Sequence, residues 1–113
     1  MDWISLKDSK QLDEIVAESK AKPVLIYKHS TRCNISRAAL DRLERRWDAA
    51  AIGTVKRYFL DLISFREVSN QIADMFKVEH HSPQILVIFG GKSVLDLSHY
   101  DIDFDRIKSA CVP

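Results

Sequence analysis

A cysteine between a predicted strand and a predicted helix constrains this chain more than any other feature. The apolar run 23–27 is typical of a strand buried on both faces, and apolar residues at helical spacing begin at Ile35. Cys33 lies in the turn between them. The free N–H groups and the dipole of a helix start favour an anion, so we predict a reactive thiolate at Cys33, assisted by Arg32 and Arg37. The alternative is an inert buried cysteine, which is common for this residue type.

Ser36 stands three residues after Cys33, where a two-cysteine thiol oxidoreductase has its second cysteine. A hydroxyl cannot attack a mixed disulfide, so chemistry that needs a resolving thiol at this position is excluded. Ser36 can instead donate a hydrogen bond to the Cys33 thiolate or cap the helix start, and the sequence leaves both roles open. With Ser36 and Arg32, we take Thr31 and Asn34 as residues that support the reactive turn.

A second signal is the segment Ser82-Pro83, which precedes the strongest strand pattern of the chain, 85–89. A proline here is compatible with a plain strand start, and only about 5–6% of X-Pro bonds are cis. A cysteine at a helix start followed by an X-Pro before a later strand is, however, the layout of thioredoxin-like folds. We therefore predict a cis bond that brings the Ser82 backbone beside Cys33 as a substrate-binding element.

The remaining pattern predicts the order of elements. Apolar spacing predicts helices at 9–19, 34–50, 65–76 and 104–110, and strands at 24–27, 55–60, 85–89 and 92–100, with a short first strand at 3–4. The strand–helix–strand unit implies parallel pairing, and Gly90-Gly91 marks a hairpin. The prediction is an α/β thioredoxin-like fold over residues 1–113, as one domain, with a mixed central sheet of four to five strands and helices on both faces. Ile35 and Trp47 are expected on the apolar face of the second helix.

Composition limits the partners. The chain has 113 residues and a net charge of +1, which gives no strong field for nucleic acid or an anionic membrane. No apolar run approaches the roughly 20 residues of a membrane helix, and the first residues do not resemble a signal peptide. We expect a cytoplasmic protein in which Cys33 and Cys111 rest as thiols. Cys111 can act as a distant resolving thiol, but we interpret it as a spare exposed thiol near a frayed terminus.

His80 and His81 are candidate metal ligands or thiolate partners. No third ligand is identifiable near them in the sequence, and two cysteines far apart do not form a zinc site. We interpret the pair as a solvated loop feature and predict no metal.

Two segments together resemble the monothiol bacilliredoxins, the YtxJ-type proteins of the bacillithiol system. They are residues 24–36 and 78–84, and the resemblance extends over nearly the whole chain. Asn34 departs from the proline of many members and changes the stiffness of the reactive turn. The resemblance implies a thioredoxin-like thiol–disulfide oxidoreductase that removes bacillithiol from client proteins. Cys33 would take up bacillithiol as a mixed disulfide, and an external low-molecular-weight thiol would release it. Bacillithiol is then a co-substrate, and no tightly bound cofactor is implied.

Two other functions compete with this one. The first is a monothiol carrier of an iron–sulfur cluster, with Cys33 and an external thiol as ligands. Carriers of that kind have glycine and phenylalanine after the cysteine, whereas this chain has Asn34 and Ile35. The second is a non-enzymatic stress or adaptor protein that keeps the fold without redox activity.

Overall fold

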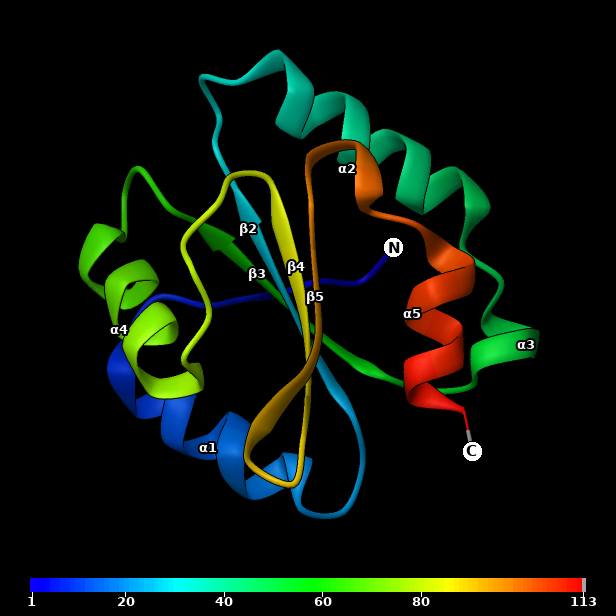
Figure 1. Cartoon of the computed structure of the whole chain (residues 1–113), viewed down its shortest axis with the longest axis horizontal. Helices are drawn as coiled ribbons and strands as arrows, with labels where there is room; N and C mark the ends of the chain where they lie inside the picture. The colour runs from blue at the N-terminus through cyan, green and yellow to red at the C-terminus, as the bar shows by residue number, and fades with distance from the viewer. Residues whose placement is uncertain (113) are drawn as a thin grey trace.

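The computed structural model describes residues 1–112 and contains a five-stranded sheet of order β1-β3-β2-β4-β5 (Figure 1). The strands are β1 (Ile4–Ser5), β2 (Val24–His29), β3 (Lys56–Asp61), β4 (Gln84–Phe89) and β5 (Lys92–Ser98). The helices are α1 (Ser9–Ser19), α2 (Asn34–Arg46), α3 (Ala49–Ile52), α4 (Arg66–Phe76) and α5 (Phe104–Cys111), with a 3₁₀ turn η1 (His99–Asp101). No helix among residues 1–112 is long and apolar enough to cross a lipid bilayer.

The sheet is mixed, as predicted. β1, β3 and β2 run parallel, whereas β4 runs antiparallel to β2 and forms a hairpin with β5. Figure 1 shows α1 and α4 on one face of the sheet and α2, α3 and α5 on the other. These layers confirm the predicted α/β architecture.

The sheet separates two hydrophobic cores, and strand β2 lies at its centre. Its side chains alternate between the faces. Val24 and Ile26 join the core beneath α1 and α4, and Leu25 and Tyr27 join the core beneath α2 and α5. All of β2 is buried, which explains why the strand reads as a continuous apolar run instead of an alternating one. The strand continues two residues beyond the predicted run, to His29.

The predicted helix 34–50 is wrong at its end. Helix α2 stops at Arg46 because Trp47 has an extended backbone, with φ −64° and ψ 125°. The Asp48 carboxylate then accepts hydrogen bonds from the amides of Ala50 and Ala51 and starts α3. Trp47 packs against the core as expected, but Ile35 is 41% exposed and does not belong to the buried face.

Two predictions near the C-terminus also need correction. The strand predicted at 92–100 ends at Ser98, because His99 adopts a left-handed φ of 55° and begins η1. Cys111 is not a spare exposed thiol. It is the last residue of α5 and packs, half-buried, against the core beneath α2 and α5. Burial raises the pKa of its thiol to about 11.

Candidate active site

The registers of the strands bring the segments that carry the predicted site residues to one end of the sheet. Lys28 at the end of β2 pairs with Gln84 at the start of β4, and Gln84 pairs with Ser98 at the end of β5. The turn that carries Cys33, the Ser82–Pro83 segment and η1 therefore leave or enter the sheet at the same end, which lies uppermost in Figure 1. These segments are far apart in sequence but lie at the same end of the sheet because β4 is antiparallel to β2.

Cys33 is the N-cap of α2. Its backbone is extended, its amide donates to the Ser30 carbonyl at 3.2 Å, and its own carbonyl accepts from the amide of Arg37 at 3.2 Å. The side chain makes no capping hydrogen bond and is partly exposed. Backbone hydrogen bonds therefore hold the turn, while the sulfur has no hydrogen-bond partner among residues 1–112 and is free to act as a nucleophile. Neighbouring Thr31, Arg32 and Asn34 are exposed.

Ser36 is fully buried and has different partners from those the sequence suggested. Its Oγ lies 2.7 Å from Nδ1 of His29 and accepts a hydrogen bond from the amide of Ser30 at 3.2 Å. The structure shows no capping bond and no bond to Cys33 from this hydroxyl. Ser36 instead fastens the first turn of α2 to the end of β2, and so determines where the intervening turn places Cys33.

Sequence reasoning assigned no role to His29. Its side chain is 7% exposed and packs against Phe59, with ring centroids 5.2 Å apart. Burial, aided by the charge of Arg37, lowers its pKa, while Asp61 acts in the opposite direction. This lowered pKa favours the neutral form of the His29 imidazole beside the Ser36 hydroxyl. The signal available in the sequence was the pair of polar residues, Lys28 and His29, that follows a continuous apolar run, because polar side chains that continue a buried strand must find buried partners.

The Ser82–Pro83 segment lies at the same end of the sheet as the turn that carries Cys33. The bond between these residues is cis, as the sequence layout predicted, and Pro83 is buried. The Pro83 carbonyl accepts a hydrogen bond from the amide of His99 at 3.0 Å. This bond connects the segment before β4 to η1.

A second buried polar cluster lies on the opposite face of β2 from His29. Lys28 has no exposed surface, and its Nζ lies 3.2 Å from Nδ1 of His80. Ser69 Oγ lies 3.4 Å from the same nitrogen, and the side-chain Nε2 of Gln84 donates to the Glu79 carbonyl at 3.0 Å. Burial lowers the pKa of Lys28 to about 8. Burial and then the charge of Lys28 lower the pKa of His80.

The two adjacent histidines therefore differ. His80 bonds to Lys28 in the interior, whereas His81 packs edge-to-face on His99 with ring centroids 5.6 Å apart. The prediction of a solvated pair is thus wrong for His80. Among residues 1–112, no group of three or more His, Cys, Asp or Glu side chains is arranged to hold a metal ion.

The structural comparisons agree with this architecture. A protein with a thioredoxin fold that is proposed to be an oxidoreductase is 29% identical, with a TM-score of 0.76, over 95% of this chain and 91% of that one. Thioredoxin from Malassezia sympodialis is 15% identical, with a TM-score of 0.72, over 96% and 87% of the two chains. Thioredoxin from Fasciola hepatica is 19% identical, with a TM-score of 0.67, over 95% and 94%. The latter two show the fold alone.

The fold, together with a thiol at the start of α2 and a cis-proline before β4, defines a thioredoxin-fold protein of thiol–disulfide chemistry. A family model described as monothiol bacilliredoxin BrxC matches residues 4–107. The chain belongs to the monothiol bacilliredoxin family, as its resemblance in sequence predicted.

Proposed function

We propose that this protein removes bacillithiol from client proteins by a cycle that uses Cys33 alone. The Cys33 thiolate attacks the bacillithiol sulfur of a mixed disulfide. A new S–S bond forms between Cys33 and bacillithiol, the original S–S bond breaks, and the client leaves as a thiolate that takes a proton from solvent. Exchange conserves the number of disulfides, so this step needs no further oxidant or reductant.

The observation that carries the proposal is the contrast between Cys33 and Ser36. The sulfur of Cys33 has no capping role and is partly exposed, whereas the Ser36 hydroxyl at the resolving position is buried and bonded to His29. Cys111 does not offer an alternative, because it is half-buried at the far end of α5, well away from the start of α2 in Figure 1. The Cys33–bacillithiol adduct therefore has no internal thiol to resolve it.

An external low-molecular-weight thiol completes the cycle. It attacks the bacillithiol sulfur of the adduct, carries bacillithiol away as a disulfide and returns Cys33 to the thiolate. The partners are therefore bacillithiolated client proteins and a free thiol, with bacillithiol as co-substrate. Such a cycle requires a reducing compartment, so we place it in the cytoplasm.

Intact-mass analysis tests the cycle. The wild-type protein is mixed with a bacillithiolated client, and both masses are followed with time. We expect the client to lose the bacillithiol mass and this protein to gain it, with loss of transfer in Cys33→Ser and near-normal transfer in Cys111→Ser. Ser36→Cys is expected to shorten the life of the adduct, because the new thiol can form an internal disulfide with Cys33.

A wild-type protein that never gains the bacillithiol mass while the client stays modified would refute the proposal. That result would favour the adaptor function. A visible absorption band after anaerobic reconstitution with iron and sulfide would favour the cluster carrier instead.

A further inference from the structure

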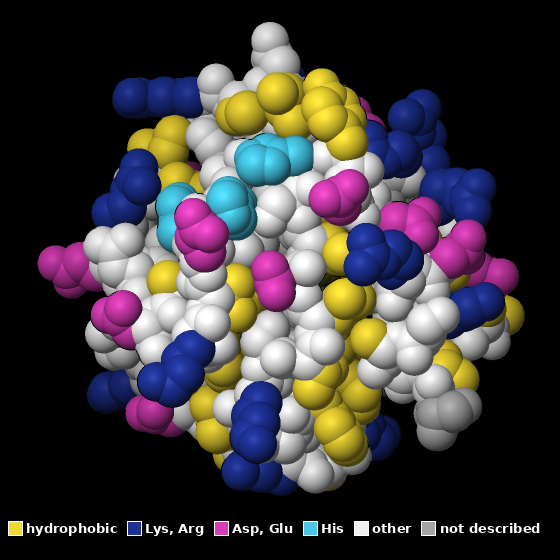
Figure 2. All heavy atoms as spheres, viewed as in Figure 1, with side chains coloured by type: hydrophobic (Ala, Val, Ile, Leu, Met, Phe, Trp, Pro, Cys, Tyr) yellow, Lys and Arg dark blue, Asp and Glu magenta, His cyan; other side chains and the backbone are white. Residues whose placement is uncertain are grey.

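A polar hollow of about 480 Å³ lies beside the Ser82–Pro83 segment. It is formed by the end of β5, by η1, by the start of α5 and by the chain that leads into β4. Its polar walls are His81, Asp96, His99, Tyr100, Asp101 and Arg106. Figure 2 shows histidine side chains gathered over this end of the central strands, bordered by a hydrophobic group and by acidic and basic side chains.

Hydrogen bonds connect the segments that line the hollow to the two segments of the candidate active site, the Ser82–Pro83 segment and helix α2. The His99 amide donates to the Pro83 carbonyl at 3.0 Å, so one wall is bonded directly to the cis-proline segment. The Arg42 guanidinium of α2 donates to the Ile102 carbonyl, just after η1, at 3.2 Å. Because α2 begins at the Cys33 turn, these two bonds hold the hollow in a fixed position relative to the candidate active site.

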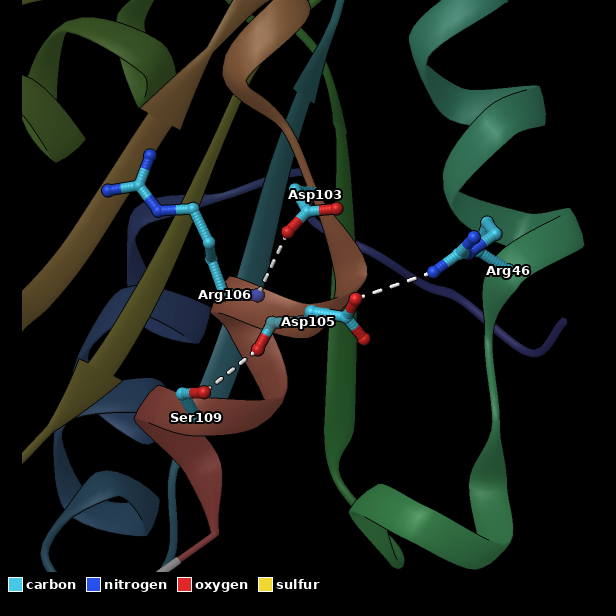
Figure 3. Close-up of polar contacts among 5 residues, drawn as sticks. All are labelled: Arg46, Asp103, Asp105, Arg106 and Ser109. Carbon is cyan, nitrogen blue, oxygen red and sulfur yellow. Dashed lines mark hydrogen bonds and ion pairs between the residues drawn. The ribbon is translucent and has the colours of Figure 1, made fainter.

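Arg106 supplies a cation that the rest of the described chain does not use. Its backbone amide bonds the Asp103 cap at 3.2 Å, but its guanidinium has no hydrogen-bond or ion-pair partner among residues 1–112. Figure 3 shows the Arg106 side chain reaching toward the strands, away from the ion pair between Arg46 and Asp105 on the other side of the helix. An arginine fork of this kind is suited to a carboxylate.

The other walls favour a ligand of mixed charge. Asp96 and Asp101 also line the hollow, and neither carboxylate has a hydrogen bond or ion pair within residues 1–112. The edge-to-face imidazoles of His81 and His99 add further hydrogen-bonding nitrogens. A simple anion would be repelled by the two carboxylates, whereas a molecule with both an ammonium and carboxylates can satisfy both signs of charge.

We propose that this hollow binds the polar end of a low-molecular-weight thiol that carries both an ammonium and carboxylate groups, while the sulfur of the thiol reaches Cys33. The proposal rests on the proposed function and adds the recognition site for its small co-substrate. Arg106 binds a carboxylate, Asp96 and Asp101 accept from the ammonium, and His99 connects the bound molecule to Pro83. The volume lies in the range of about 300–1,000 Å³ that is usual for small-molecule sites.

A thioether tests binding separately from chemistry. S-methyl bacillithiol has the amine and the carboxylates of bacillithiol but no free thiol, so it cannot exchange with Cys33. We expect titration into ¹⁵N-labelled protein to shift the amide signals of His81, His99 and Arg106. Arg106→Ala is expected to weaken binding about threefold to tenfold, in line with the loss of one exposed charge-assisted bond. The matched control is Arg46→Ala, which removes an exposed arginine near the same helix and is expected to bind like the wild type.

The proposal fails if S-methyl bacillithiol leaves these signals unmoved, or if Arg106→Ala binds it as the wild type does. It also fails if Arg106→Ala slows transfer from a bacillithiolated protein but leaves exchange with free oxidised bacillithiol unchanged, because the hollow would then recognise the polypeptide. Each of these results leaves the mass transfer to Cys33 in the wild type intact, so failure of the site is distinguishable from failure of the cycle.

Discussion

Replacement of Lys28 by methionine should stabilise the protein near neutral pH. The lysine side chain has no exposed surface, and His80 is the one side chain bonded to its amine among residues 1–112. Burial lowers its pKa from 10.5 to about 8, so below pH 8 the folded protein holds a buried charge at a cost of about 3 kcal/mol. Methionine has a similar length and no charge. It removes one hydrogen bond, worth about 1 kcal/mol, and leaves a net gain of about 2 kcal/mol at pH 7.

The same charge makes wild-type stability depend on pH. Between pH 8 and 10.5 the unfolded chain holds the Lys28 proton while the folded protein has released it. The unfolded state then binds more protons, so the free energy of unfolding rises with pH. Integration of this difference gives a gain of about 1 kcal/mol between pH 7 and pH 8.5. Above pH 9 the raised pKa of the Cys111 thiol acts in the opposite direction, which sets the upper limit of the useful window.

Urea unfolding followed by tryptophan fluorescence, in the presence of a reductant, measures both effects. We expect Lys28→Met to be more stable than wild type at pH 7 and to lose part of that advantage by pH 8.5. Lys10→Met, at an exposed position of α1, is the control and should match the wild type throughout. The reasoning is refuted if wild-type stability is flat from pH 7 to 8.5, or if Lys28→Met retains the wild-type pH dependence.

Three further results are expected. Ser36→Ala should lower the free energy of unfolding by about 2 kcal/mol, because His29 and the Ser30 amide lose a buried partner; urea unfolding measures it, and an unchanged midpoint would contradict it. Iodoacetamide should label Cys33 faster than Cys111 near neutral pH, since burial raises the pKa of Cys111 to about 11; peptide mapping would show the reverse order if Cys33 were inert. Stability should fall as the pH drops below about 6.5, because His29 has a lowered pKa and the unfolded chain takes up its proton first. The fall should be smaller in His29→Asn.

Local patterns in the sequence were sufficient for the architecture and for the position of the thiol. The apolar run that became β2, the helical spacing of α1 and the Gly90-Gly91 turn are each set by neighbours in sequence; α1 and the turn formed where predicted, and β2 began where predicted. The turn that carries Cys33 and the segment that carries Pro83 lie at the same end of the sheet because β4 is antiparallel to β2. The end of α2 was missed because the Asp48 cap competes with continuation of the helix, and the apolar spacing does not show which of the two is favoured.

The partners of Ser36 and Lys28 could not be predicted for a different reason. Each depends on a contact across the fold, and the residues involved carry no periodic signal. Lys28 lies just after the predicted strand 24–27, and a lysine at the end of a strand is normally assigned to an exposed position. Lys28 is buried because α4 and the loop before β4 cover that face of the sheet and bring Ser69 and His80 over it. The burial of Lys28 can be recognised only when the position of α4 over the sheet is known.

The last two residues of β2 make contacts on both faces of the sheet, and these contacts position the candidate active site. Lys28 and His29 are consecutive, so their side chains point in opposite directions. His29 bonds to Ser36 and fastens the start of α2, which carries Cys33, while Lys28 bonds to His80 in the segment that leads to Pro83. The thiol and the cis-proline segment are thus attached to adjacent residues of one central, fully buried strand. We therefore expect the incoming disulfide of the proposed one-cysteine cycle to bind between two segments that the end of β2 holds in place.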